Sequence, residues 1–157
     1  MNSQQVVQCL LKDGYTRTAF QGVFSVDNLP LKVYYPCAIV VNTDTSEGVG
    51  EHWTSIYINC FAEGVYFDSF GLGPRHPAVL GFLASHTIKW SYVDVQIQNV
   101  LSTACGFFCI YFLHKLCRGA TVPQFLRPFA RLHLYQNDVW IRTWANHYGR
   151  DLFSIRW

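Results

Sequence analysis

The pattern of apolar and polar positions along the chain predicts a central group of strands. The runs 37–41, 53–58 and 65–67 are short, apolar and rich in β-branched and aromatic residues, which predicts three strands. Turn residues between the last two runs predict a β-hairpin. A further strand is expected near 89–95, whereas residues 15–35 are mixed and carry several turn signals.

Helices are predicted on both sides of this strand group. Ser3 is expected to cap a short amphipathic helix that ends at Gly14, and a second short helix is expected near 77–85. The run 106–116 is apolar all round, which predicts a helix buried on most of its sides. One or two further helices are expected after Pro123. The predicted fold class is therefore α+β, a central mixed β-sheet flanked by helices.

Composition favours one domain over residues 1–157, because half of the residues are hydrophobic and only 14% are charged. The net charge of +2 is too small to imply nucleic-acid binding by itself. Arginines nevertheless lean toward the C-terminal half, which leaves an anionic partner open: Arg118, Arg127, Arg131, Arg142, Arg150 and Arg156. No apolar run approaches the ~20 residues of a membrane span, and no signal-peptide pattern is present, so we expect no membrane association.

The cysteines are expected to be reduced, mostly buried thiols in an intracellular compartment. There are six of them: Cys9, Cys37, Cys60, Cys105, Cys109 and Cys117. Four potential metal ligands lie close in sequence, but His114 points to the opposite side of the predicted helix from Cys105 and Cys109. The chain has no Cys-x-x-Cys pair, so we expect neither a metal site nor another cofactor.

Two residues at one end of the predicted hairpin suggest acid–base chemistry. His52 follows a loop with two glycines and stands at the start of a strand, where substrate can reach it. Asp68 ends the second strand, so pairing of the strands brings the imidazole and the carboxylate to the same end. Each residue taken alone is more typical of a structural role, as a surface or packing histidine or a turn-capping aspartate.

Cys105 stands at the predicted start of the buried helix, where the helix dipole favours the reactive thiolate. Gly106 lets a substrate backbone approach closely, and His52 is the best-placed base for the thiol. A buried, unreactive helix-start thiol is the structural alternative. A papain-like arrangement with Cys37 and His147 has no supporting local motif.

Three local strings occur in the order His, Asp, Cys: His52-Trp53, Phe67-Asp68-Ser69-Phe70-Gly71 and Ala104-Cys105-Gly106-Phe107-Phe108-Cys109. Together they resemble the adenovirus endopeptidase, a cysteine protease grouped with the ubiquitin-like-protein proteases. The similarity covers roughly residues 36–70 and 96–116.

The resemblance implies that Cys105 is the nucleophile, His52 the general base and Asp68 the residue that orients the base. It also implies a glutamine, seven residues before the cysteine, as an oxyanion-hole donor. That position is Gln98, and Gln96 is the alternative if the loop is offset.

Substrate preference follows from the same resemblance. Trp53 would cover a narrow channel that admits only glycine-sized residues, with Gly106 beneath the substrate backbone, although a core aromatic role for Trp53 is equally open. The chain also departs from the family. Asp68 stands where the viral enzymes usually have Glu and the ubiquitin-like-protein proteases have Asp, which leaves the subgroup open. Thr87 replaces the cysteine that binds the viral peptide cofactor, so activation by a disulfide-linked peptide is not expected.

We therefore expect a monomeric cysteine endopeptidase that cleaves polypeptides after Gly-containing motifs. Its expected role is precursor maturation in a virus or virus-like element, in the host nucleus or the virion. A nucleic-acid or peptide activator stays open. Two alternatives remain: a protease specific for ubiquitin or ubiquitin-like conjugates, and a non-catalytic, capsid-associated interaction domain.

Overall fold

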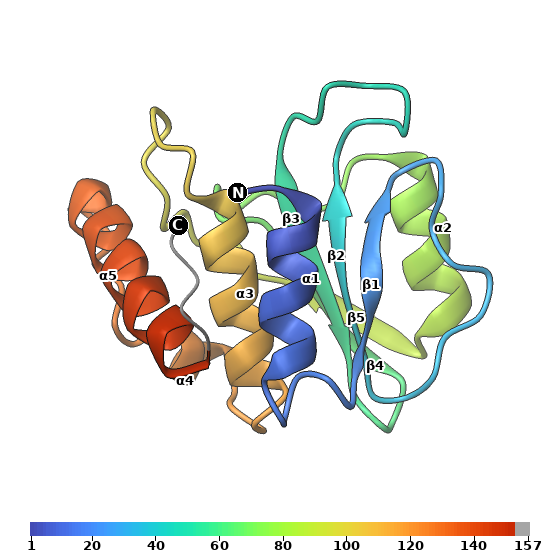
Figure 1. The fold of residues 1–157 in the computed structure, drawn as a ribbon. Coiled ribbons are helices and arrows are strands. Elements are labelled where there is room, and N and C mark those ends of the chain that lie inside the picture. Colours follow the sequence, from blue (N-terminus) through green and yellow to red (C-terminus); the bar gives the residue numbers. More distant parts are fainter. Residues whose placement is uncertain (153–157) are drawn as a thin grey trace.

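Five strands form one mixed sheet at the centre of the molecule, in the order β1-β2-β3-β4-β5 (Figure 1). This computed structural model describes residues 1–152. The middle three strands pair antiparallel, and each edge strand pairs parallel to its neighbour. The strands are β1 (Phe20–Ser25), β2 (Cys37–Asn42), β3 (Trp53–Ile58), β4 (Glu63–Phe67) and β5 (Lys89–Tyr92).

Helices cover both faces of the sheet, with α2 on one face and the other helices on the opposite face (Figure 1). The helices are α1 (Ser3–Lys12), α2 (Pro77–His86), α3 (Cys105–Leu116), α4 (Val122–Leu126) and α5 (Leu134–Leu152). The α+β class predicted from the sequence is confirmed. Among the residues from 1 to 152, no helix has the length and apolar character needed to cross a membrane.

The alternating side chains of β2 join two hydrophobic cores. Ala38 and Val40 pack with the core that contains α3, whereas Ile39 and Val41 pack with the core that contains α2. All four are 0% exposed, which explains why this strand reads as a continuous apolar run in the sequence.

Several element boundaries differ from the sequence-based predictions. Asn2, not Ser3, caps α1, because its side chain accepts a hydrogen bond from the Gln5 backbone N–H. Strand β1 forms within the segment 15–35 that showed only mixed signals. Strand β5 stops at Tyr92, before the predicted end.

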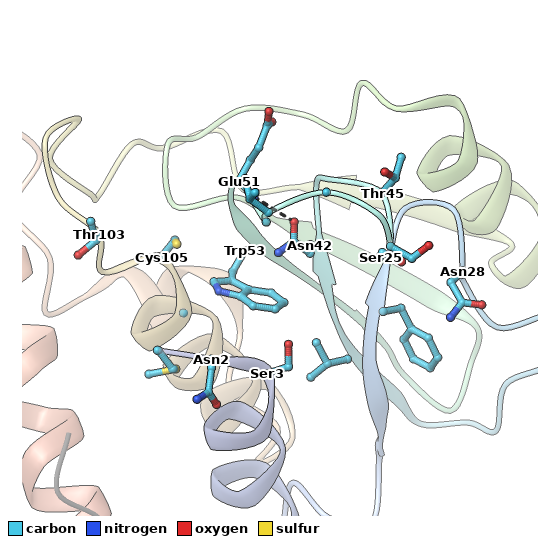
Figure 2. Close-up of a pocket in the computed structure, with 18 residues that line it drawn as sticks. Asn2, Ser3, Ser25, Asn28, Asn42, Thr45, Glu51, Trp53, Thr103 and Cys105 are labelled. Carbon is cyan, nitrogen blue, oxygen red and sulfur yellow. Dashed lines mark hydrogen bonds between the residues drawn. The ribbon is translucent and has the colours of Figure 1, made fainter.

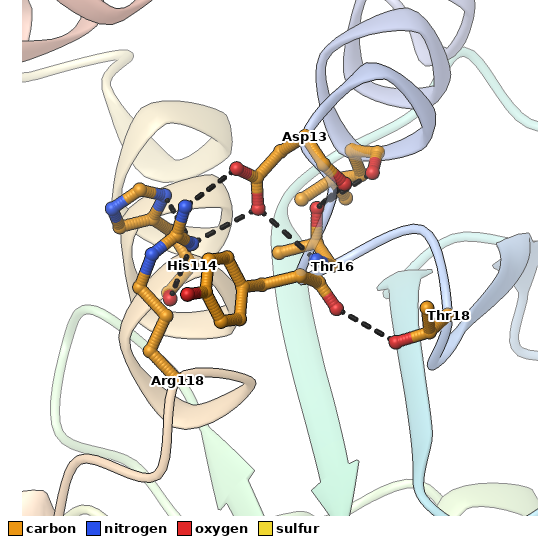
Figure 3. A network of polar contacts seen from close by, with 7 residues as sticks. Asp13, Thr16, Thr18, His114 and Arg118 are labelled. Atoms are coloured by element: carbon orange, nitrogen blue, oxygen red, sulfur yellow. Dashed lines mark hydrogen bonds and ion pairs between the residues drawn. The ribbon is translucent and has the colours of Figure 1, made fainter.

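A partly buried ion pair ties α1 to α3 at the ends remote from Cys105 (Figure 3). Asp13 is 4% exposed and accepts two hydrogen bonds from Arg118, at 2.6 and 2.9 Å. The same guanidinium donates to His114 Nδ1 at 2.9 Å. Burial and this positive charge lower the pKa of His114 to about 4, so the imidazole stays neutral near pH 7. The network fixes how the two helices lie against each other.

The C-terminal end of the chain lies partly outside this description. Residues 153–157 of the expected domain are outside the described residues, and Arg156 is among them. Nothing is described for the side chain of Arg150 either.

All six cysteines are free, and Cys9, Cys37 and Cys109 are buried.

Candidate active site

The β3–β4 hairpin brings His52 and Asp68 together. Strand β3 begins just after His52, and β4 ends just before Asp68, so antiparallel pairing places the two side chains at the same end. His52 Nε2 lies 2.8 Å from Asp68 Oδ1. The side chains are 17% and 8% exposed, so the contact is largely shielded from water. This leaves Nδ1, the other ring nitrogen of His52, for a second partner.

The turn after β4 holds the carboxylate and the imidazole in position. The backbone N–H of Phe70 donates to the same Asp68 oxygen at 2.8 Å. The Phe70 ring stacks on the His52 ring, with centroids 4.8 Å apart. Gly71 follows with φ +72, and a Cβ there would lie 2.6 Å from the Gln96 backbone nitrogen. This close contact between two backbone segments therefore requires glycine.

Cys105 is the first residue of α3 and lies at the edge of a cavity of about 600 Å³ (Figure 2). The cavity is lined by Trp53, by the first residues of α1, by the end of β1 and by the loop between β2 and β3. Gly106 lies in the cavity wall, where a Cβ would meet Met1 Sδ at 2.9 Å and Trp53 Cδ1 at 3.5 Å. The thiol is thus reachable through the cavity, and Met1 and Trp53 pack close to the Gly106 backbone beside it.

The pKa values of the thiol and the imidazole shift in opposite directions. Burial alone raises the pKa of Cys105, but a hydrogen bond with His52 and backbone N–H groups outweigh burial and lower it. Burial likewise lowers the pKa of His52, but its bonds with Asp68 and Cys105 raise it to about 9. These directions favour a thiolate–imidazolium pair near neutral pH.

Gln98 is buried, and its amide is already engaged. Its side-chain nitrogen donates to the Ser102 carbonyl at 2.7 Å, and its oxygen accepts from the Ser69 hydroxyl at 2.6 Å. Gln96 is half-buried and donates to the Gln98 carbonyl at 3.0 Å. Both glutamines thus lie on the segment that packs against the turn after Asp68.

Sequence reasoning missed two groups at this site. The first is Met1 and Asn2, which line the cavity beside Cys105 because α1 and α3 begin at the same end of the molecule. The second is Ser69, whose backbone and side chain both hold the segment that leads to Cys105. Ser69 lies within a string that resembles the family, but its type alone did not distinguish it from an ordinary turn residue.

These elements together form an α+β fold that is shared with solved protease structures. Among solved structures, the ASFV pS273R protease superposes with a TM-score of 0.57 at 18% identity, covering 90% of this chain and 62% of that one. ChlaDub1 from Chlamydia trachomatis superposes with a TM-score of 0.53 at 14% identity, covering 99% of this chain and 80% of that one.

The sequence itself is similar to the protease of porcine adenovirus A serotype 3. The two are 27% identical over 59% of this chain and 52% of that protein, so this chain spans about half the length of the curated relative. The predicted resemblance to the adenovirus endopeptidase is thereby confirmed. No protein-family model matches the chain.

Proposed function

We propose that the protein is a cysteine peptidase in which Cys105 is the nucleophile, His52 the acid–base residue and Asp68 the residue that orients the imidazole. One observation carries the proposal. His52 Nε2 lies 2.8 Å from Asp68 Oδ1, and interaction between the imidazole and the thiol at the start of α3 raises the pKa of His52 and lowers that of Cys105. Such a pair is the requirement for attack by sulfur at neutral pH.

The reaction proceeds through a thioester. The Cys105 thiolate attacks the carbonyl carbon of the peptide bond, and the oxygen becomes a transient oxyanion near the Cys105 backbone N–H and Gln98. The C–N bond then breaks as His52 donates its proton to the leaving amine. Water attacks the thioester, His52 accepts a proton from this water, and the carboxylate product leaves as the thiolate is restored.

The proposed substrates are polypeptides with glycine next to the cleaved bond. Trp53 and Gly106 both line the cavity beside Cys105, as the resemblance requires of a glycine-selective channel, and this supports the preference. Precursor maturation in a virus or virus-like element is the proposed setting, by analogy with the adenovirus protease.

A second candidate is a protease for ubiquitin-like conjugates, since that group has Asp in the position of Asp68, although this residue leaves the subgroup open. Fluorogenic ubiquitin-like substrates, compared with Gly-containing peptides at equal concentration, separate the two candidates. Cleavage of the peptides alone would support precursor processing.

Mass spectrometry after labelling with an electrophilic thiol probe tests the peptidase itself. We expect selective labelling of Cys105 over exposed Cys60, and strong loss of that labelling in His52→Ala. Equal labelling of the two thiols at neutral pH would exclude an activated nucleophile and support the non-catalytic alternative.

A further inference from the structure

Helix α5 holds the segment that leads into Cys105, which we call the nucleophile loop (residues 97–104). Asn137 Nδ2 donates to the Ile97 carbonyl at 2.9 Å, and the Asn99 N–H donates to Asp138 Oδ2 at 3.3 Å. The two adjacent residues of α5 thus bond the loop backbone at two positions.

A third contact lies one helical turn further along α5. Arg142 Nη2 donates to the Thr103 hydroxyl at 3.3 Å, and the guanidinium lies over the Phe107 ring, 5.3 Å from its centroid. Asp138 bonds the loop through Oδ2, while its Oδ1 is buried without a hydrogen-bond partner among the described residues. The loop is therefore fastened along most of its length, up to two residues before the thiol.

Packing alone does not explain the residue types on this face of α5. Asn137 and Asp138 are 2% and 6% exposed, in positions where an apolar side chain would fill the same space without desolvation. Burial raises the pKa of Asp138, although the Asn99 N–H and the charge of Arg142 favour its ionised form. Burying a polar group lowers the free energy of unfolding unless hydrogen bonds offset its loss of hydration.

The other side of the loop is fixed to the hairpin. The backbone N–H groups of Ile97 and Gln98 both donate to the Ser69 carbonyl, at 2.9 and 3.0 Å. Ser69 directly follows Asp68, so the loop lies between the acid of the site and α5. Any displacement of the loop away from Ser69 changes the position of Cys105 relative to His52.

We propose that Asp138 and Arg142 are positioning residues, which hold the nucleophile loop so that Cys105 and Gln98 keep their places relative to His52. This inference rests on the proposed function for its catalytic consequence. Neither residue touches the thiol or the imidazole, so the effect acts through the loop. Misplacement of a reacting group by ~1 Å can cost about 100-fold in rate.

The test compares Asp138→Ala, Asp138→Asn and Arg142→Ala with Thr143→Ala as the matched control. Thr143 is exposed on the same helix, and its hydroxyl donates to the Val139 carbonyl of that helix at 2.9 Å. We expect kcat to fall about 10- to 100-fold in Asp138→Ala, with KM changed less than about twofold. Asp138→Asn should restore most of kcat, because its amide oxygen still accepts from the Asn99 N–H. The control should match wild type.

A second readout does not depend on peptidase activity. Hydrogen exchange at the amides of residues 99 and 102 should become faster in Asp138→Ala and Arg142→Ala than in Thr143→Ala. Unchanged exchange and unchanged kcat in both variants would overturn the proposal. If exchange becomes faster in the two variants but even the wild type has no peptidase activity, α5 still supports the loop, and the proposed function is refuted instead.

Discussion

Replacing Asp68 with Asn tests the electrostatics of the site most directly. The pKa of His52 rises from 6.5 to about 9 in the folded protein, although burial opposes this rise. One pKa unit is ~1.36 kcal/mol, so the net preference for the imidazolium is about 3 kcal/mol. Asn keeps the shape and can accept the same hydrogen bond, but it removes the negative charge. We therefore expect the pKa of His52 to fall by at least about one unit in Asp68→Asn.

The change should appear in the pH dependence of kcat/KM with a fluorogenic Gly-containing peptide. In the proposed mechanism activity requires the imidazolium with the thiolate, so the alkaline limb reports loss of the His52 proton, as a property of the coupled pair. We expect this limb near pH 9 in wild type and at lower pH in Asp68→Asn, with a smaller loss of activity near pH 7 than in Cys105→Ala. An alkaline limb that stays in place would refute the reasoning.

The pH dependence of stability gives an independent check that the pKa of His52 is raised in the folded protein. Because the folded pKa of His52 lies above 6.5, its contribution to the free energy of unfolding is present below pH 6.5 and is lost as pH rises through about 9. Asp68→Asn should therefore destabilise the protein more at pH 6 than at pH 9.5 in denaturant titrations. A larger loss of stability at pH 9.5 than at pH 6 would contradict a raised pKa for His52.

Three further predictions concern the surroundings of the site. Gln98→Ala should lose about 2.7–4 kcal/mol of transition-state stabilisation, measured from kcat, and Gln96→Ala much less; the reverse order would transfer the oxyanion role to Gln96. Gly71→Ala should lower the free energy of unfolding by at least about 1 kcal/mol, because φ is +72 and the new Cβ meets backbone; Gly14→Ala, with nothing within 4 Å, is the control and should be nearly neutral. Between pH 7 and pH 5, wild type should lose about 2 kcal/mol more stability than His114→Gln, because the folded pKa of His114 is about 4 and the unfolded state takes up the proton first. Parallel pH curves for these two proteins would count against a buried neutral imidazole.

The hairpin end of the site was the most predictable part. Periodicity located β3 and β4, and antiparallel pairing then required His52 and Asp68 to lie at one end. The start of α3 at Cys105 followed from the apolar run that begins just after it. These are local patterns, in which each residue type agrees with the structure that it adopts.

Non-local contacts were not predictable in the same way. Strand β1 contains Gly22, with φ +141, and pairs parallel to β2 at the sheet edge, so its formation depends on tertiary contacts more than on its own residues. Asn137 and Asp138 resemble solvent-facing helix residues in the sequence, because their buried partners lie about 40 positions earlier. The hydrogen bond between the Ser69 hydroxyl and the Gln98 amide likewise cannot be predicted from the spacing of residues in the sequence.

The position of Met1 in the cavity wall beside Gly106 has a practical consequence for work with recombinant protein. An affinity tag or fusion partner joined ahead of this methionine would begin at the wall of the cavity beside Cys105. Its last residues would compete with added peptides and shield the thiol from reagents. Enzyme preparations that retain such an extension would then appear latent, for a reason unrelated to the chemistry of the protein itself.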